Sequence, residues 1–327
     1  MVYGERDDEA IFFAAVAKRE GIKLKCTHRM LTEDNVEEAK HSIAIVIVTA
    51  CKITEYIACK LYSYGVKYIL TRSTGFDHID KEAVKKYQLR VANVPIYSHF
   101  AVSEYTVMLI LNLIRRFPTI LQKVERQDFT LEGILGTEVN QMKVGIIGTG
   151  KIGEQTAKLL KVFGTSILAY TPHPNQQLEN ILTYVSLNEL LSLSDIIVLQ
   201  CSLNKFTRHL INENNIKKMK KGVFLVNTAR GGLMDFEAVL QGLKCKKISG
   251  IAVDVYENEK EYFRKDCQEM QIHDPCFSQL IKMPNVIFTP HVAFYTHNAI
   301  RNLIQISFQN LNDFIQDGTC ENEILLS

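Results

Sequence analysis

A glycine-rich motif between a predicted strand and a predicted helix restricts the fold of this chain more than any other feature. The segment Gly148-Thr149-Gly150-Lys151-Ile152-Gly153 follows the apolar run Lys143–Ile147 and leads into a helical pattern over Ile152–Phe163. In this context the first glycine permits a tight turn, the second lets a pyrophosphate approach the backbone, and the third lets the helix pack on the strand. The N–H groups and the dipole at the helix start attract phosphate. A glycine-rich turn without a ligand is the alternative, but the flanking strand and helix favour a dinucleotide-binding βαβ unit.

Short β-branched runs alternate with helical patterns along the rest of the chain. The other predicted strands are Ile43–Val48, Val66–Leu70, Arg90–Val94, Ser166–Tyr170, Asp195–Leu199, Val223–Val226, Ile248–Val253 and Val286–Thr289. Two further helices are predicted, an apolar one over Ala101–Arg116 that Pro118 stops and an amphipathic one over Asn298–Ile315. The alternation favours an α/β fold with doubly wound, Rossmann-like parallel sheets. A length of 327 residues exceeds what one core usually serves, so we expect two such domains, with the seam near residues 95–120.

Composition excludes several classes of partner. The net charge of +2 gives no general attraction to nucleic acid or to an anionic membrane. The lysine runs at 217–221 and 244–247 lack interleaved aromatic residues, so we interpret them as solvated surface. No apolar run approaches the roughly 18 residues that cross a bilayer, and the acidic N-terminal segment has no apolar signal core. The eight cysteines include no Cys-x-x-Cys pair or zinc spacing. We therefore expect a cytoplasmic protein with reduced thiols and no metal, nucleic-acid or membrane partner.

The residue after the strand Ser166–Tyr170 bears on the choice of coenzyme. An Asp or Glu is expected about 20 residues after the glycine motif, where it binds the adenine ribose of NAD. Here that position holds Thr171, which lacks both the strong carboxylate acceptor for the 2′-hydroxyl of NAD and the charge that repels the 2′-phosphate of NADP. No arginine stands nearby, and His173 could contribute only a partial charge. The sequence therefore leaves both NAD(H) and NADP(H) open.

Three residues with chemical potential follow predicted strands of the second series. Arg230 follows Val223–Val226, Glu259 follows Ile248–Val253 and His291 follows Val286–Thr289. Because the carboxyl ends of parallel strands line the ligand crevice, we expect the three side chains to gather there. A guanidinium could bind a carboxylate in a bidentate manner. Taken singly, each residue has an ordinary alternative: a surface ion pair for Arg230, a solvated acid for Glu259 and a capped loop for His291.

Several motifs together resemble the D-isomer-specific 2-hydroxyacid dehydrogenase family, and the resemblance runs from Tyr3 to the last helix. The segments that carry it, besides the glycine motif, are Arg72–Asp80, Asn93–Ser98, Asn227–Gly231, Asp254–Glu259 and Pro290–Thr296. The stretch between Glu259 and Pro284 is similar to the D-lactate and (R)-2-hydroxyisocaproate branch, and also to the D-lactate dehydrogenases of vancomycin-resistance clusters.

The resemblance implies that the chain reduces pyruvate or a larger 2-oxo acid to the (R)-2-hydroxy acid as a homodimer. Arg230 would bind the substrate carboxylate, His291 would be the general acid and base, and Glu259 would orient His291 and favour its protonated form. The resemblance also implies a dinucleotide-binding domain over residues 99–296. Residues 1–98 and 297–327 would form a discontinuous substrate domain.

Further roles follow from the resemblance. The backbone of Thr74 and Gly75 and the Tyr97 hydroxyl would contact the substrate, and Asp254 would receive the nicotinamide carboxamide. The predicted wall around the substrate side chain consists of Val48, Thr49, Tyr97, Phe294 and Tyr295. Val48 replaces a bulkier aromatic residue of some D-lactate enzymes, which favours branched or aromatic 2-oxo acids.

One departure from the family pattern lies beside the expected cofactor. The family usually has His-Val-Pro after the strand Asp195–Leu199, where this chain has Gln200-Cys201-Ser202. We expect Cys201 and Ser202 near the cofactor. A thiol there could make the enzyme sensitive to thiol reagents, but a buried, unreactive Cys201 is the favoured interpretation.

Two alternative functions stay open at this point. A nucleotide-sensing corepressor can share this fold, because fold alone does not fix activity. A hydroxypyruvate or glycerate dehydrogenase would use the same residues on a different acid. The intact set of Arg230, Glu259 and His291 favours turnover over sensing.

Overall fold

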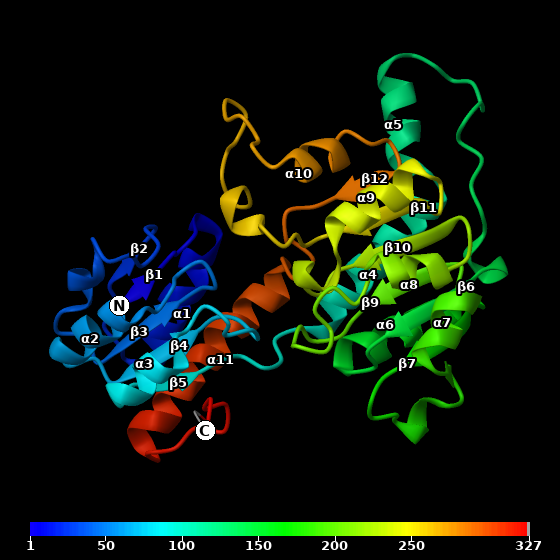
Figure 1. Cartoon of the computed structure of the whole chain (residues 1–327). Coiled ribbons are helices and arrows are strands. Elements are labelled where there is room, and N and C mark those ends of the chain that lie inside the picture. The colour runs from blue at the N-terminus through cyan, green and yellow to red at the C-terminus, as the bar shows by residue number, and fades with distance from the viewer. Residues whose placement is uncertain (326–327) are drawn as a thin grey trace. The chain divides into compact units, whose positions relative to one another are not determined.

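The computed structural model describes residues 1–325, which divide into two compact units. Unit 1 consists of Met1–Ser98 and the chain from Tyr295 onward, and unit 2 is His99–Phe294. The chain thus leaves unit 1 after Ser98 and returns at Tyr295, two residues before the predicted return at 297. Figure 1 labels helices and strands of both units where there is room.

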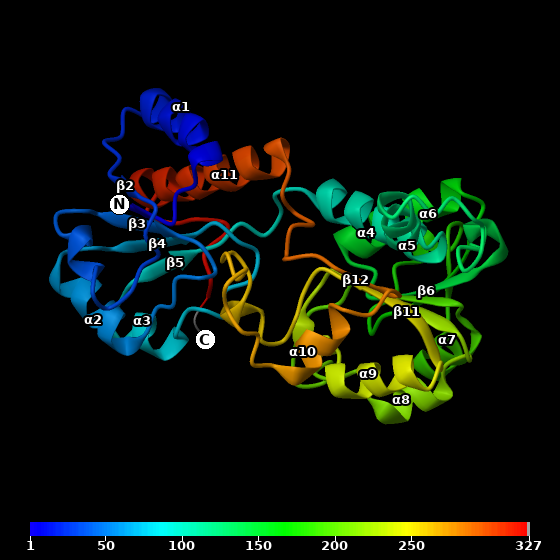
Figure 2. The same cartoon turned by 90° about the horizontal axis from the view of Figure 1, so that it is seen from above.

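Unit 1 is built on a five-stranded sheet in which every strand pair is parallel. The strand order is β2-β1-β3-β4-β5, with β1 at Val2–Tyr3, β2 at Cys26–Thr27, β3 at Ala44–Ile47, β4 at Tyr68–Thr71 and β5 at Arg90–Ala92. The helices are α1 (Ala10–Glu20), α2 (Glu55–Ser63), α3 (Lys81–Lys86) and α11 (His297–Gln316). Figure 2 shows α1 and α11 on one face of this sheet and α2 and α3 on the other.

The last helix completes the core of unit 1. α11 packs against α1 and β4, and its apolar stripe is buried there. The ring of Phe308 meets Phe13 of α1 edge-on at 6.1 Å, and Phe314 stacks on Tyr68 of β4 at 5.0 Å. The last helix of the chain therefore covers the sheet formed by its first residues.

Unit 2 holds a larger sheet of seven parallel strands. The order is β12-β11-β10-β9-β6-β7-β8, with β6 at Lys143–Ile147, β7 at Ser166–Tyr170, β8 at Thr183–Tyr184, β9 at Ile196–Leu199, β10 at Val223–Asn227, β11 at Ile248–Val253 and β12 at Val286–Phe288. The helices are α4 (His99–Ile114), α5 (Phe117–Glu125), α6 (Lys151–Val162), α7 (Leu187–Leu193), α8 (Glu213–Lys218), α9 (Phe236–Lys244) and α10 (Pro275–Leu280). α4 and α6 cover one face, and α7, α8 and α9 cover the other (Figure 2). The predicted fold class, two doubly wound parallel α/β domains, is confirmed.

The strand order of unit 2 indicates which edge of its sheet can bind a ligand. The chain runs from β6 to β7 and β8, then crosses back so that β9 lies beside β6 on the other side. The direction of winding therefore reverses between β6 and β9, and ligands of open α/β sheets bind at the carboxyl ends of strands at such a point. The loops there begin at Gly148 after β6 and at Gln200 after β9.

The prediction that Pro118 stops the long helix was wrong in one respect. α4 ends at Ile114, and Arg116 adopts a left-handed backbone with φ 53°. Pro118 then lies in the first turn of a separate helix, α5, where a missing N–H costs no hydrogen bond. The proline therefore opens a new helix.

Among the described residues, no helix combines the length and apolar character that a membrane crossing needs.

Candidate active site

The glycine motif has the geometry that its three predicted roles require. Gly148 has φ 97°, and a Cβ on it would lie 2.6 Å from the Gln200 carbonyl oxygen. A Cβ on Gly153 would lie 2.0 Å from the Gly148 carbonyl oxygen, so only glycine lets α6 pack this closely. Gly150 is the N-cap of α6, and a Cβ on it would meet nothing within 4 Å. The open space beside Gly150 and the helix N-terminus fits the phosphates of a dinucleotide.

Tyr184 connects this motif to the loop after β7, a contact that sequence analysis missed. Its hydroxyl lies 3.2 Å from the Thr149 hydroxyl and accepts a hydrogen bond from the Asn175 backbone N–H at 3.1 Å. The loop that begins at Thr171 is thereby held against the glycine motif. No residue pattern pointed to Tyr184, because β8 is a strand of only two residues.

The side chains of His291 and Glu259 meet directly. His291 follows β12 and Glu259 follows β11, and His291 Nδ1 lies 2.8 Å from Glu259 Oε1. The other oxygen, Glu259 Oε2, accepts the Tyr256 backbone N–H at 3.2 Å. Burial opposes the charge of Glu259, but the hydrogen bond and charge of His291, with the Tyr256 N–H, lower the pKa of this carboxyl overall. With Nδ1 committed to a carboxylate, Nε2 is the imidazole nitrogen that can exchange a proton with a ligand.

The backbone at His291 is strained and is held by Asp254. His291 has φ 59°, in the left-handed region that β-carbon-bearing residues seldom adopt. Asp254 is fully buried and accepts hydrogen bonds from the Thr289 hydroxyl at 2.5 Å and from the N–H groups of Val292 and Ala293 at 2.9 and 2.8 Å. Burial raises the pKa of the Asp254 carboxyl despite these bonds. The residue predicted to receive the nicotinamide carboxamide thus also fixes the turn that carries His291.

Arg230 lies in a turn after β10 that the neighbouring asparagine holds. Asn227 donates through Nδ2 to the Arg230 carbonyl at 2.9 Å and accepts the Ala229 N–H at 3.0 Å. The Arg230 guanidinium donates to the Ala229 carbonyl at 2.7 Å and makes no ion pair within residues 1–325. A half-buried guanidinium without a carboxylate partner can accept an anionic ligand.

Gly231 brings the Arg230 turn against the loop that leads to Glu259. A Cβ on Gly231 would lie 2.1 Å from the Tyr256 carbonyl carbon and 2.4 Å from the Glu257 nitrogen. Only glycine at position 231 permits this approach. The turns of Arg230, Glu259 and His291 are therefore neighbours at one edge of the unit 2 sheet.

The predicted substrate contacts of unit 1 lie at the carboxyl edge of its own sheet. Val48 is buried at the end of β3, and the Thr74 hydroxyl donates to the Val94 carbonyl at 2.9 Å, close to the end of β5. The Tyr97 carbonyl accepts the Asn302 side chain of α11 at 2.8 Å. Tyr295 lies under the Arg6 guanidinium, 5.0 Å from the ring centroid. Phe294 belongs to unit 2, where its ring meets His291 edge-on at 6.3 Å.

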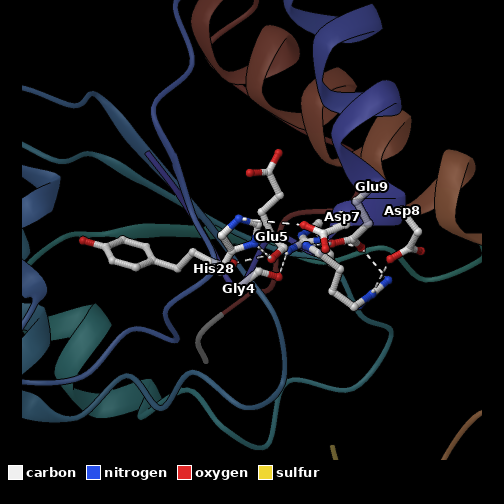
Figure 3. A network of polar contacts seen from close by, with 9 residues as sticks. Gly4, Glu5, Asp7, Asp8, Glu9 and His28 are labelled. Carbon is white, nitrogen blue, oxygen red and sulfur yellow. Dashed lines mark hydrogen bonds and ion pairs between the residues drawn. The ribbon is translucent and has the colours of Figure 1, made fainter.

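A polar network not foreseen from the sequence holds the loop after β1 at the same edge (Figure 3). Arg72 is buried and pairs through Nη1 with Glu9 at 2.5 Å, while its Nη2 donates to the carbonyls of Tyr3 and Gly4 at 3.2 and 3.0 Å. Arg6 pairs with the same Glu9 oxygen at 2.7 Å and with Asp8 at 3.3 Å. The loop of residues 4–9 is thus fixed by a carboxylate that two guanidinium groups share.

Comparison with known proteins identifies the family. Residues 107–293 match the model described as the D-isomer specific 2-hydroxyacid dehydrogenase, NAD binding domain. The chain belongs to the D-isomer-specific 2-hydroxyacid dehydrogenase family. Relatives of this dehydrogenase include the D-specific alpha-keto acid dehydrogenase of Enterococcus faecium, which is 39% identical over 313 residues and 96% of each chain. An aromatic 2-oxoacid reductase of Clostridium sporogenes is 40% identical over 265 residues, or 81% of this chain and 80% of the relative.

Solved structures agree with this placement over the whole dehydrogenase. A D-lactate dehydrogenase from Treponema pallidum superposes with a TM-score of 0.90 at 36% identity, covering 99% of this chain and 98% of the other. A D-2-hydroxyisocaproate dehydrogenase superposes with a TM-score of 0.91 at 35% identity, with the same coverage. The predicted membership of the D-lactate and hydroxyisocaproate branch is confirmed.

Proposed function

We propose that this dehydrogenase reduces a small 2-oxo acid to the (R)-2-hydroxy acid, with Arg230, His291 and Glu259 as its catalytic residues. The observation that carries the proposal is the pair of His291 Nδ1 and Glu259 Oε1 at 2.8 Å, beside the turn of an arginine that has no carboxylate partner within residues 1–325. An imidazole oriented by a carboxylate and an available guanidinium are the two groups that a 2-oxo acid needs for its carbonyl and its carboxylate.

The roles of the residues follow from their charges. Arg230 binds the substrate carboxylate through two parallel N–H groups and fixes the 2-oxo group near Nε2 of His291. Bound nicotinamide supplies the hydride. His291 donates a proton from Nε2 to the carbonyl oxygen as negative charge develops there, and Glu259 stabilises the imidazolium before the transfer. Two cationic groups at a developing alkoxide provide electrostatic stabilisation, which is usually the largest catalytic contribution.

For the cofactor, we propose that residues 148–153 bind its pyrophosphate and that Cys201 and Ser202 line the adjacent part of the site. The match to an NAD-binding domain supports NAD(H). Thr171 carries no charge that would repel a 2′-phosphate, so NADPH belongs in the same assay. Asp254 would bind the nicotinamide carboxamide with the acceptor capacity that its three hydrogen bonds leave.

For the substrate, we propose pyruvate or a branched or aromatic 2-oxo acid. Thr74, Gly75 and Tyr97 would contact it from unit 1, and Val48, Phe294 and Tyr295 would surround its side chain. Support comes from the small side chain at position 48 and from the similarity to an enzyme named aromatic 2-oxoacid reductase.

We further propose that the enzyme is a cytoplasmic homodimer. The eight cysteines all have free thiols, which is typical of a reducing compartment.

Large apolar side chains on α5 and in the loop after it are strongly exposed, and a second copy would cover them. They are Phe117, Leu121, Val124, Phe129, Leu131 and Leu135. Light scattering on the purified chain gives the mass that tests this.

The direct test is a matrix of substrates and coenzymes. Pyruvate, 2-oxoisocaproate, phenylpyruvate and hydroxypyruvate are each mixed with NADH or NADPH, and absorbance at the reduced nicotinamide band is followed. We expect oxidation with at least one pair. Turnover of hydroxypyruvate alone would favour a glycerate dehydrogenase, and no oxidation with any pair would favour a nucleotide-sensing protein.

His291→Ala tests the assignment of the general acid. We expect kcat/KM to fall about 10²- to 10⁴-fold, because the proton donor is lost, while the Kd for NADH stays near that of the wild type. His28→Ala is the matched control, since His28 is an exposed histidine of unit 1. Normal turnover in His291→Ala, or an equal loss in His28→Ala, would contradict the role.

A further inference from the structure

Three uncharged polar side chains form a cluster between α4 and the ends of β9 and β10. Gln200 Nε2 lies 3.0 Å from Thr106 Oγ1 and 3.1 Å from Thr228 Oγ1, and the two hydroxyls are 2.7 Å apart. Thr106 of α4 is fully buried and Thr228 is 8% exposed. The cluster lies where family members usually have a histidine in place of Gln200.

The available protons determine how this cluster is bonded. The Thr106 hydroxyl donates its single proton to the Val102 carbonyl at 2.7 Å, so its oxygen can only accept from the other two groups. The amide nitrogen of Gln200 supplies one proton to each threonine oxygen, and the Thr228 hydroxyl then donates to Thr106. Every proton of the cluster has an acceptor in this arrangement. An imidazole could not replace the amide, because neither of its nitrogens carries two protons.

Gln200 also touches the glycine motif through its backbone. A Cβ on Gly148 would lie 2.6 Å from the Gln200 carbonyl oxygen, which shows how closely the two loops pack. On its other side the Gln200 amide holds Thr228, which begins the turn that carries Arg230. One residue therefore connects the loop that fits the cofactor phosphates with the turn that presents the guanidinium.

We propose that Gln200 is a positioning residue: its amide, acting through Thr228, fixes the Arg230 turn relative to the glycine motif so that the guanidinium meets the substrate carboxylate when the dinucleotide is bound. This rests on the proposed function, since it assumes that Arg230 binds a carboxylate. Gln200 needs no contact with the substrate, and its effect appears in carboxylate binding and turnover, with coenzyme affinity preserved.

The test uses Gln200→Leu, which keeps the size of the side chain and removes both donors. The readouts are the Kd for NADH by fluorescence, the Kd of the enzyme–NADH complex for oxamate as a carboxylate probe, and kcat/KM for the best 2-oxo acid. We expect the NADH Kd to change less than twofold, while oxamate affinity and kcat/KM fall about tenfold to hundredfold, as small misplacements of catalytic groups do. Gln200→Met is measured in parallel, so that a failure of the leucine variant to fold leaves the test intact.

A double-variant cycle and a control make the result specific. In a Thr228→Val background, Gln200→Leu should lower oxamate affinity less than twofold further, because the amide acts through that hydroxyl. Thr156→Val removes a buried hydroxyl that donates to the Ile152 carbonyl one turn back in α6, and it should change neither constant.

Two results would overturn the proposal. One is unchanged oxamate affinity and kcat/KM in both folded Gln200 variants, and the other is an equal loss of NADH and oxamate affinity. A wild type that neither turns over nor binds oxamate with NADH would instead refute the proposed function itself.

Discussion

Each sheet carries an arginine just beyond the carboxyl end of a strand, and the two arginines have opposite surroundings. Arg72 follows β4 in unit 1, its side chain is 2% exposed, and it pairs with the equally buried Glu9. Arg230 follows β10 in unit 2, is half-buried, and within residues 1–325 its guanidinium donates only to the carbonyl of its own neighbour, Ala229. The residue type is the same and each arginine follows the carboxyl end of its strand, yet one guanidinium is neutralised within the protein and the other is available.

The surroundings of the guanidinium distinguish an arginine that stabilises the fold from one that can bind a ligand. A guanidinium removed from water must be paired, and the pair then contributes little beyond fixing the groups around it. Glu9, Tyr3 and Gly4 accept hydrogen bonds from the two terminal nitrogens of Arg72, so that residue holds the loop after β1 in place. Arg230 keeps its charge for a ligand. A substitution of Arg72 should therefore lower the stability of the protein, and a substitution of Arg230 should lower its turnover.

The largest effect is expected for Arg230→Gln. The variant loses two charge-assisted hydrogen bonds to the substrate carboxylate, each contributing about 1.5–3 kcal/mol, so kcat/KM should fall about 10²- to 10⁴-fold. The midpoint of thermal unfolding should stay unchanged, because the guanidinium donates to a backbone carbonyl and, among the described residues, to no side chain. Steady-state kinetics and calorimetry check both parts. A large drop in the unfolding midpoint with turnover retained would reverse our assignment of the two arginines.

Arg72→Met should act on stability in the opposite way. Removing one partner of a buried pair leaves Glu9 partly uncompensated, which costs about 3–5 kcal/mol of the free energy of unfolding. Urea denaturation measures this value, and kcat of the folded fraction should stay near that of the wild type. Adding Glu9→Leu should recover part of the loss, because replacing a whole buried pair by apolar groups is often neutral. No recovery in the double variant would show that Arg72 acts through its carbonyl contacts alone.

The sequence predicted the longer secondary-structure elements better than the short ones. Strands of five or six mostly apolar residues, such as Ile248–Val253 and Ser166–Tyr170, were predicted with their observed bounds, because a strand covered on both faces is largely apolar. The two-residue strands β1, β2 and β8 were missed, since so short a segment has no periodicity. The helix α5 was missed because a proline that opens a helix and one that stops a helix look alike before the turn is known.

Within the candidate site, residues carried by local motifs could be predicted and those defined by distant contacts could not. The glycine motif specified its own turn, because strand, turn and helix follow one another directly. The pairing of Arg72 with Glu9 depends on two segments 63 residues apart, and nothing in either segment names the other. Gln200 was noted as a departure from the family pattern, but its bonds to Thr106 and Thr228 became visible only when α4, β9 and β10 were placed together.

Glu259→Gln should have an intermediate effect that depends on pH. The pKa of Glu259 is lowered in the folded state, so its charge stabilises the fold fully above the unfolded value near 4.5, and this stabilisation is lost as the pH falls through the folded pKa. The glutamine variant should lack this acid-side loss. At neutral pH it should lower kcat/KM about 10- to 100-fold, because His291 loses a charge-assisted hydrogen bond of about 1.5–3 kcal/mol.

Urea unfolding from pH 3 to 7, in roughly half-unit steps, separates this effect from a general loss of charge. Glu213→Gln serves as the comparison, since Glu213 is an exposed carboxylate that pairs with Lys217 four residues along α8. Its stability curve should follow that of the wild type. If the Glu259 and Glu213 variants behave alike in both assays, then the pair with His291 has no special role in unit 2.

The smallest effect is expected for Arg6→Ala, which tests whether burial explains the comparison. Arg6 and Arg72 contact the same oxygen of Glu9, but the Arg6 side chain is 32% exposed and reaches over the Tyr295 ring. An ion pair with access to solvent and a stack of this kind contribute about 1 kcal/mol together, so the variant should lose that much in urea unfolding. Two guanidinium groups on one carboxylate should therefore differ severalfold in their contribution to stability, and the difference measures what removal from water adds. An equal loss of unfolding free energy in Arg6→Ala and Arg72→Met would contradict this explanation. The Glu9 carboxylate would then hold the loop after β1 equally well through an exposed and a buried partner.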